Sequence, residues 1–427
     1  MSLSAKEHHK TDCGKTKIEL SFAKRPLAYK VAVFYMFVFG TQFVWIEGPT
    51  VSLFKAAAML LSPLLFLLCR VKFGGAWFFS GIYFALICMS VVMRDASFNL
   101  SVFYTLGCLC TFSSFSSLID SGVFTYDDAV DILKKFIYMY TIFLILQQIK
   151  AFTGIGYSPI INYYSMNLNG LFKFNSLFIE PSHLGRVLAI MLLAYLELKR
   201  LKYKEKLSLK TLWENDRWVI SAALYTLFMS GSGAAIVALI VLGGYVVMRG
   251  SPGFILFAFI AVLALSPILH KMEHVHRAVS TLEVSTTMDI EQIRKNDNSA
   301  VTRVAPLIAF VENFRPAAPD FWFGQSEDAP YYYANIGIIE RYGALAYIGL
   351  LLLLFACCFR GMVSVEFIFF CGMFAGTVGN VAYVWFSMMI LAIVKHFYNK
   401  GKIATLFQNT SQGRTSNFCQ SHQKKDM

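Results

Sequence analysis

The sequence predicts an all-helical bundle that spans a membrane about twelve times. Hydrophobic residues make up 56% of the 427 residues and charged residues only 15%, whereas soluble domains carry about a quarter charged residues. Apolar runs close to the ~20 residues of a spanning helix recur along the chain and are apolar all round the helix. Forty Phe and 21 Tyr exclude a disordered chain. The continuous runs also exclude a soluble enzyme and a β-barrel, whose strands alternate apolar and polar residues.

Twelve mostly apolar segments are candidates for the spanning helices. They are Tyr29–Ile46, Val51–Cys69, Trp77–Met93, Leu100–Ile119, Phe136–Phe152, Leu184–Leu198, Trp218–Met229, Ala234–Met248, Phe254–Leu269, Ala344–Phe359, Val365–Val378 and Val381–Val394. The Ser230-Gly231-Ser232-Gly233 insert separates the seventh segment from the eighth, because paired glycines favour a turn. We therefore expect two short helices joined by a tight hairpin at this point.

The distribution of basic residues predicts the orientation of the spans. Positive charge concentrates in the cytoplasmic loops of membrane proteins. With the lysine-rich N-terminal tail inside and twelve alternating spans, every basic cluster falls on the cytoplasmic side, including the dense one between Lys199 and Arg217. Both termini are therefore expected in the cytoplasm, as tails over residues 1–28 and 399–427. The net charge of +12 is then a topology signal, and no basic patch indicates a nucleic-acid partner.

Two outward segments are long enough to carry a site. One covers residues 153–183, within the first nine spans (residues 29–269). The other covers residues 270–333 and precedes the last three spans (residues 334–398). In this large loop, apolar residues recur at helical spacing, at Val301, Val304, Ile308 and Val311. The repeat predicts a short amphipathic helix, and it fits a helix on the outer membrane surface as well as a lid packed on the bundle.

The sharpest local feature is Phe178-Ile179-Glu180-Pro181-Ser182-His183-Leu184-Gly185-Arg186 at the start of the sixth span. Pro181 suits the first turn of a helix and Glu180 its positive end, so an ordinary helix start explains these two residues. Arg186 is less ordinary, because a charge inside an apolar span is unfavourable unless it snorkels to the interface. Helical spacing turns His183 about 60° from Glu180 and Arg186 about 60° further. The Glu180 carboxylate and the His183 imidazole are the candidate catalytic groups. They are expected on the same side of the helix end as the Arg186 guanidinium, the candidate phosphate-binding group.

A second set of candidates consists of outward cations. Arginine forks bind phosphate oxygens bidentately, which suits a diphosphate leaving group. The cations in question are Lys173, Arg303, Arg315 and Arg341. Arg341 is the strongest of them because it directly precedes a span. Each of them alone also fits an ordinary solvated loop charge.

One apparent metal-binding motif is better explained otherwise. Asp127-Asp128-x-x-Asp131 resembles an aspartate-rich site for magnesium diphosphate. It faces the cytoplasm in the predicted topology, however, and no convincing second acidic motif completes it. Acidic residues that open a helix explain it more simply. We therefore expect the outward site to use no metal ion and no cofactor.

Together these features resemble the bacterial O-antigen polymerases, a family of the polymerase and ligase superfamily. The resemblance rests on the many spans, the Phe-x-Glu-Pro-Ser motif at Phe178–Ser182, the serine-glycine hairpin near Ser230 and the large outward loop. The loop exit, Asn335-Ile336-Gly337 followed by Tyr342-Gly343 and a span, is also similar. The resemblance covers roughly residues 172–354.

The resemblance implies a fold like that of the C-type membrane glycosyltransferases and an inverting, metal-independent activity. Such an enzyme joins oligosaccharide repeats carried on undecaprenyl diphosphate at the periplasmic face of the bacterial inner membrane. Glu180 would lie in the family's acidic motif, and arginines of the large loop would hold the diphosphate. The family often has an arginine upstream of that motif, where this chain has Lys173. The implied partners are the lipid-linked oligosaccharide and membrane lipid, with room for a chain-length regulator protein.

Three other functions stay open. An O-antigen ligase is the nearest, but ligases tend to carry a His-Asn pair at the loop exit, where this chain has Ala334-Asn335. A lipid-linked oligosaccharide flippase would line a central path with charged residues on several spans. Here we expect Arg186 to be nearly the only charge in the spans, which counts against a flippase. A membrane scaffold would not need the charged outer loop.

Overall fold

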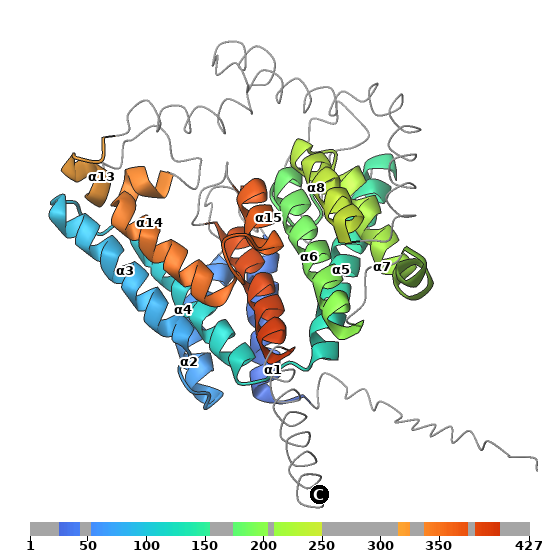
Figure 1. Ribbon diagram of the computed structural model, residues 1–427, viewed down its shortest axis with the longest axis horizontal. Helices are drawn as coiled ribbons and strands as arrows, with labels where there is room; N and C mark the ends of the chain where they lie inside the picture. Colours follow the sequence, from blue (N-terminus) through green and yellow to red (C-terminus); the bar gives the residue numbers. More distant parts are fainter. Residues whose placement is uncertain are drawn as a thin grey trace, which may run out of the picture.

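The computed structural model is a bundle of helices (Figure 1). It describes residues 25–42, 53–153, 174–203, 209–249, 315–324, 337–374 and 381–401. All regular structure among these residues is helical, and no strand occurs among them. The predicted all-helical fold class is confirmed at this level.

Some of the helices are suited to a membrane. The helices are α1 (Leu27–Gly40), α2 (Leu53–Leu68), α3 (Gly75–Met93), α4 (Leu100–Asp120), α5 (Tyr126–Thr153), α6 (Pro181–Tyr203), α7 (Leu209–Met229), α8 (Gly233–Arg249), α13 (Pro319–Phe323), α14 (Gly337–Cys357), α15 (Val365–Phe374) and a last helix over residues 382–401. Of the described helices, three are long and apolar enough to cross a membrane, namely α3, α4 and α14. α1, α2, α8 and α15 contain shorter apolar helices. These segments indicate a membrane-associated protein.

The structure corrects the bounds of several predicted spans. The first was predicted to reach Ile46, but α1 ends at Gly40 and Thr41 takes an extended backbone (φ −126°, ψ 141°). In contrast, α5, α6 and α7 each extend well beyond the predicted apolar run. Hydropathy marks only the apolar part of a helix, and these three helices continue into charged segments. The ninth predicted span and the repeat from Val301 to Val311 lie outside the described residues.

The predicted hairpin between the seventh and eighth spans is confirmed. α7 ends at Met229 and α8 begins at Gly233. Gly231 between them has a left-handed backbone (φ 56°), which a glycine adopts without steric cost. The two helices pack against each other beyond the turn.

The predicted large loop contains one described short helix, α13, which packs on α14 and α3. The contact with α14 brings two backbones together at glycines with positive φ. A Cβ added at Gly343 would collide with the carbonyl oxygen of Trp322, and one at Gly324 would lie 2.6 Å from that of Arg341. On the α3 side, the Ser90 hydroxyl donates to the Phe323 carbonyl. α13 is therefore fixed to this edge of the bundle.

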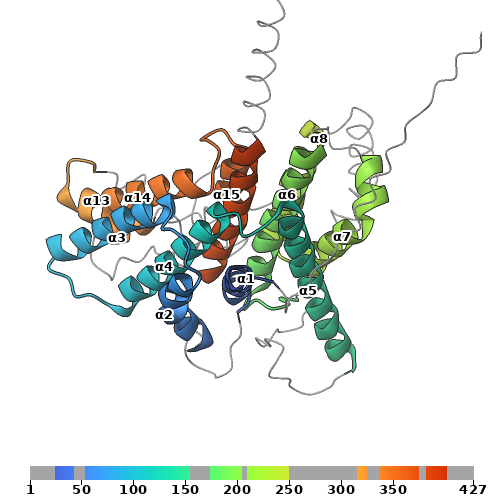
Figure 2. The ribbon, with the colours of Figure 1, turned by 90° about the horizontal axis from the view of Figure 1, so that it is seen from below.

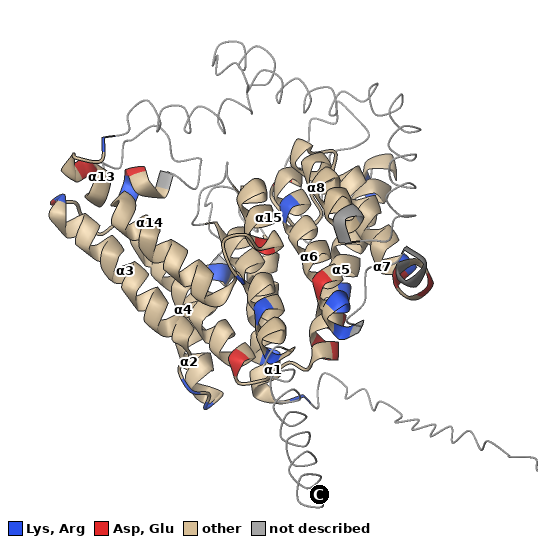
Figure 3. Cartoon of the chain, in the orientation of Figure 1, with Lys and Arg blue, Asp and Glu red and all other residues tan. Residues whose placement is uncertain are grey.

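Two ends of the bundle can be recognised from contacts of α6. At the end we call the Glu180 end, the start of α6 lies beside the end of α1, the end of α7 and the start of α8. At the opposite end, called the Glu197 end, the end of α6 lies beside the start of α15. α6 and the last helix lie side by side (Figures 1 and 2), and they run parallel because Tyr383 meets Arg186 while Arg360 links Glu197 to Tyr398. Charged residues are sparse along the helices and gather at the lower end of α6 (Figure 3).

Candidate functional site

The segment just before α6 is buried, and it holds the motif from Phe178 to Arg186 in place. Just before α6, Gln147 of α5 donates from Nε2 to the Ser176 carbonyl (3.0 Å) and accepts from the Ser176 N–H (2.8 Å). Gln42, after α1, donates its N–H to the Leu177 carbonyl (2.8 Å) and accepts from the Ile179 N–H (3.1 Å). Ser176 has a positive φ of 51°, a backbone conformation that only tight surroundings maintain. The loop is thus clamped between two helices.

The aromatic residue of the motif completes this anchor. Phe178 is fully buried, and its ring centroid lies 5.2 Å from that of Tyr140. Tyr140 in turn donates its hydroxyl to the Gly40 carbonyl (2.7 Å) and accepts at its own carbonyl from the Ser176 hydroxyl (2.7 Å). A group on such a support is held within the narrow range of geometry that catalysis needs.

Glu180 stands at the exposed tip of this support. Pro181 begins α6, and the Glu180 carbonyl accepts from the His183 N–H (3.1 Å) and the Leu184 N–H (3.3 Å). The Glu180 side chain is 60% exposed, and its Oε2 lies 3.6 Å from His183 Nε2. The same oxygen accepts from the Ser182 hydroxyl (3.0 Å). The carboxylate therefore has an imidazole beside it and remains open on its other sides.

Tyr383 of the last helix joins the imidazole to the guanidinium. Its ring stacks on His183 with centroids 4.1 Å apart and planes 25° apart. Its hydroxyl accepts from Arg186 Nη1 (3.3 Å). Arg186 is 6% exposed and Tyr383 2%. Glu180, His183 and Arg186 thus lie together at one helix end, as their spacing predicts, and their chemical roles stay predictions.

Tyr383 is a residue that sequence reasoning missed. The only signal for it is a tyrosine at the outer end of the last predicted span. Tyrosine in that position is usually an interfacial anchor. Helical spacing within one segment finds Glu180, His183 and Arg186, whereas a contact nearly two hundred residues away along the chain depends on the packing of the bundle.

The two features that carried the family resemblance are neighbours in space. A Cβ added at Gly185 would lie 2.9 Å from the Ala235 Cβ and 3.0 Å from the Ser232 hydroxyl. The Ser232 hydroxyl accepts from the Ala235 N–H (3.1 Å), and the Ser230 hydroxyl donates to the Leu227 carbonyl (2.7 Å). The serines therefore act as turn and helix-start residues, and the hairpin packs tightly on the first turn of α6.

The other predicted cations do not join this group in the described part of the chain. Arg315 is exposed and lies just before α13. Arg341 lies in the first part of α14, with its guanidinium 5.2 Å from the centre of the Tyr342 ring. In both views α13 and the part of α14 next to it lie on the far side of the bundle from α6 (Figures 1 and 2). Lys173, Arg303 and the loop exit at Ala334 lie outside the described residues.

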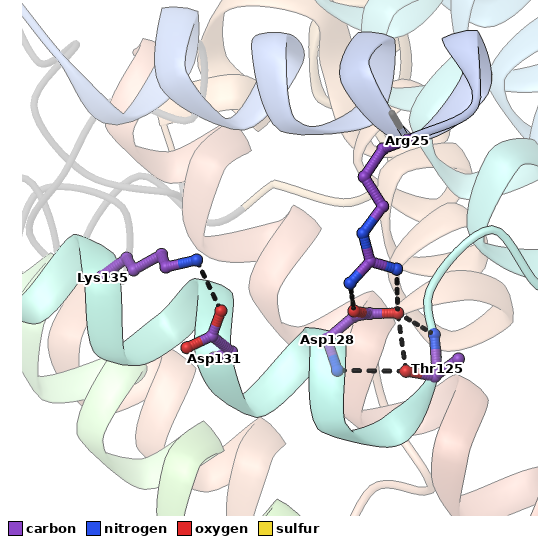
Figure 4. A network of polar contacts seen from close by, with 5 residues as sticks. All are labelled: Arg25, Thr125, Asp128, Asp131 and Lys135. Carbon is purple, nitrogen blue, oxygen red and sulfur yellow. Dashed lines mark hydrogen bonds and ion pairs between the residues drawn. The ribbon is translucent and has the colours of Figure 1, made fainter. Parts of the chain in front are cut away.

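The aspartate-rich segment forms a helix start with basic partners (Figure 4). Thr125 and Asp128 make reciprocal backbone contacts, with Thr125 N–H to Asp128 Oδ2 at 3.0 Å and Asp128 N–H to Thr125 Oγ1 at 3.2 Å. This arrangement is a capping box. Arg25 pairs with Asp128 (2.7 Å), and the neighbouring ion pairs are Lys135–Asp131 (2.6 Å) and Lys202–Asp127 (3.0 Å). Within the described ranges, no group of three or more His, Cys, Asp or Glu side chains is arranged to hold a metal ion.

The expectation that Arg186 is nearly the only charge in the spans is wrong. Lys55, Lys150, Glu197 and Glu366 are each at most 7% exposed and lie within α2, α5, α6 and α15. Single charges inside a strongly apolar run barely change its hydropathy, so they are easily overlooked. They are tolerated where the bundle supplies a partner.

Glu197 shows how such a charge is accommodated. Its Oε2 accepts from Arg200 Nη2 (2.9 Å) and Arg360 Nη2 (3.0 Å), and its Oε1 accepts from the Tyr245 hydroxyl. Arg360 also pairs with Glu366. Two carboxylates and two guanidiniums thus form a neutral network that joins α6, α8 and α15.

The Glu180 end holds side chains that can carry out acid–base chemistry on a substrate that develops negative charge. The partly exposed Glu180 carboxylate, next to the His183 imidazole, can accept a proton. The buried Arg186 guanidinium, one turn after His183, can stabilise negative charge. Comparisons with protein-family models, with curated proteins and with solved structures find no match for this chain.

Proposed function

We propose that this protein is a membrane glycosyltransferase of the O-antigen polymerase kind. It would join undecaprenyl-diphosphate-linked oligosaccharide repeats at the periplasmic face of a bacterial inner membrane. The observation that carries the proposal is the arrangement at the Glu180 end. An exposed carboxylate lies 3.6 Å from an imidazole, and a buried arginine on the next turn shares Tyr383 with that imidazole.

The reaction needs a base and a cation. The acceptor hydroxyl oxygen forms a bond to the anomeric carbon of the donor glycan. The bond from that carbon to the diphosphate oxygen breaks, and its electron pair leaves with the lipid diphosphate. Glu180 accepts the hydroxyl proton, with His183 beside it as the other candidate base. Arg186 is nearly buried, and a cation in such surroundings acts more strongly on the developing phosphate charge than one in water.

The helix directions agree with alternating spans, one part of the proposed topology of about twelve spans with both termini inside. The ends of α1 and α7 and the starts of α6 and α8 lie together at the Glu180 end. Odd-numbered spans that run outward and even-numbered spans that run inward give this pattern. Alkaline phosphatase fused after Asp289 should then be active, and fused after Lys204 inactive. The opposite result would place the Glu180 end in the cytoplasm and overturn the proposal.

The test of function is what a deletion strain accumulates. Without the polymerase, single repeats are still exported and attached, so lipopolysaccharide should carry one repeat in place of the ladder. A gel of extracted lipopolysaccharide shows this directly. Restoration by the wild-type gene but not by Glu180→Gln would link the defect to the site. Glu214→Gln, which changes an exposed carboxylate on α7, is the matched control and should restore the ladder.

Each alternative predicts a different product. Loss of a ligase strands polymer on the lipid carrier, whereas loss of a flippase leaves bare core because no repeat reaches the periplasm. The test includes the flippase alternative because buried charges occur on four helices. Two of them, Glu197 and Glu366, belong to the neutral network with Arg360 and do not line an open path.

A further inference from the structure

Three charged side chains and a tyrosine meet where α5, α6 and α7 come together at the Glu197 end. Asp216 of α7 is 4% exposed, and its Oδ1 accepts from the Tyr195 hydroxyl of α6 (2.5 Å). The same oxygen pairs with the ammonium groups of Lys199 on α6 (3.0 Å) and of Lys134 on α5 (3.7 Å). We call these four residues the Asp216 cluster. The proposed reaction, at the other end of α6, does not use it.

The Asp216 cluster has more positive than negative charge. Two ammonium groups share one carboxylate, and the tyrosine is neutral at physiological pH, which leaves a net charge of +1. The carboxylates of Asp127 and Asp131 do not balance this charge, because each pairs with a lysine outside the cluster. Glu214 is exposed and lies about 200° around α7 from Asp216. An anion beside the two ammonium groups would therefore complete the charge balance.

Lys134 is able to bind such an anion. Its side chain is 30% exposed, and its distance to Asp216 is too long for a hydrogen bond. An ammonium group has three donors, and Lys134 donates no hydrogen bond to another described residue. Its ammonium and that of Lys199 contact the same oxygen, so they are close enough together for one phosphate group to contact both.

The position of the cluster along its helices indicates what kind of anion it meets. Lys134 lies two residues before the predicted fifth span, Lys199 directly after the sixth, and Asp216 two residues before the seventh. Each therefore lies where the apolar part of its helix meets the polar part. Trp213 and Trp218, on either side of Asp216 along α7, are 59% and 70% exposed. Tryptophans of this kind are typical of the headgroup level of a membrane, which is also the level of lipid phosphates.

We propose that the Asp216 cluster binds the phosphate of an anionic phospholipid such as phosphatidylglycerol. Lys134 and Lys199 contact the phosphate, whose single negative charge matches the surplus charge of the cluster. Asp216 and Tyr195 hold the two lysines in place, with the ammonium groups 5.9 and 5.6 Å from the centre of the tyrosine ring. In phosphatidylcholine the choline group already neutralises the phosphate, so this lipid should bind more weakly. The inference does not depend on the proposed reaction.

Native mass spectrometry of the purified full-length protein, titrated with phosphatidylglycerol, tests the site. Lys134→Gln should weaken binding about fivefold, the effect expected for one basic residue at an anionic lipid surface. Lys135→Gln is the matched control. It removes the next lysine along α5, which is 72% exposed and pairs with Asp131, and it should leave binding unchanged. Equal binding by wild type and Lys134→Gln, or an equal loss in both variants, would overturn the site.

Asp216→Asn separates lipid binding from folding. This variant leaves two lysines together without their carboxylate, so its unfolding temperature in phosphatidylcholine nanodiscs should be lower than that of wild type. Phosphatidylglycerol supplies a negative charge at the same place. Nanodiscs of this lipid should therefore raise the unfolding temperature of Asp216→Asn more than that of wild type. An equal or smaller rise would make the cluster a purely structural network and overturn the proposal.

Two further arms identify the ligand. Phosphatidylcholine that binds as tightly as phosphatidylglycerol would overturn the assignment to an anionic lipid. Inorganic phosphate that displaces phosphatidylglycerol would assign the site to a soluble anion and overturn the proposal as well. The polymerase proposal fails separately, because an unchanged ladder in the deletion strain would refute it without affecting the binding result.

Discussion

The two ends of α6 handle a glutamate in opposite ways. Glu197 is fully buried, and two arginines and a tyrosine occupy its oxygens. Glu180 is 60% exposed, and its cationic neighbour Arg186 is buried and contacts a tyrosine from another helix. One end holds a closed set of opposite charges, whereas the other separates an accessible carboxylate from a nearly buried guanidinium.

This contrast indicates which charged side chains are available for chemistry. A carboxylate whose oxygens are already bonded to guanidinium groups has little capacity to accept a proton or to admit a substrate. Such networks hold helices together, and removing one member exposes the others to the full penalty of burial. A carboxylate held by a rigid loop yet open to the surroundings retains its capacity as a base. The comparison therefore predicts loss of activity at one end and loss of stability at the other.

Substitutions at the Glu180 end should reduce activity strongly. Glu180→Gln keeps the size of the side chain but removes the base, so polymer formation should fall by about 10²–10⁴-fold, the usual contribution of general acid–base catalysis. Arg186→Ala should also abolish the ladder. Membrane levels of both variants should match wild type by immunoblot. A full ladder from Glu180→Gln would mean that the motif is an ordinary helix start.

The second effect is on stability at the Glu197 end. Arg360→Ala leaves Glu197 and Glu366 buried without this partner, and breaking a buried pair in this way costs about 3–5 kcal/mol. The unfolding temperature of the purified protein in detergent should drop clearly. Arg217→Ala, at an exposed arginine on α7, is the control and should change it little. If Arg360→Ala were as stable as the control, the closed network would not be a source of stability.

A smaller effect sharpens the role of Tyr383. Tyr383→Phe keeps the ring that stacks on His183 but removes the acceptor for Arg186. A hydrogen bond to a charged group contributes about 1.5–3 kcal/mol, and this one is long (3.3 Å), so activity should fall about tenfold in a transfer assay. Tyr383→Leu removes both contacts and should be clearly worse. Equal activity of the two variants would show that stacking on His183 is unimportant.

Local features of this chain could be predicted from its sequence, whereas contacts between distant helices could not. The hairpin at Ser230 and the grouping of Glu180, His183 and Arg186 depend on turn chemistry and helical spacing, and both were predicted. Contacts that depend on the order of helices in the bundle, such as Tyr383 with Arg186, were not. Buried charges such as Glu197 were overlooked because their partners come from other helices.

A substitution at Arg341 should change the ladder least, and it separates two hypotheses about which residues bind the diphosphate. If arginines of the large loop hold this group through bidentate forks, Arg341→Lys should weaken the ladder strongly, because a point charge does not replace a fork. The structure places Arg341 on α14, which packs on α3 and α13, and Arg186 on α6. A diphosphate bound at Arg186 would not need Arg341. We therefore expect Arg341→Lys, which keeps the positive charge of this half-buried side chain, to change ladder intensity far less than Arg186→Ala does. A loss as large as that of Arg186→Ala would assign the diphosphate to the loop arginines and count against Arg186 as the residue that binds it.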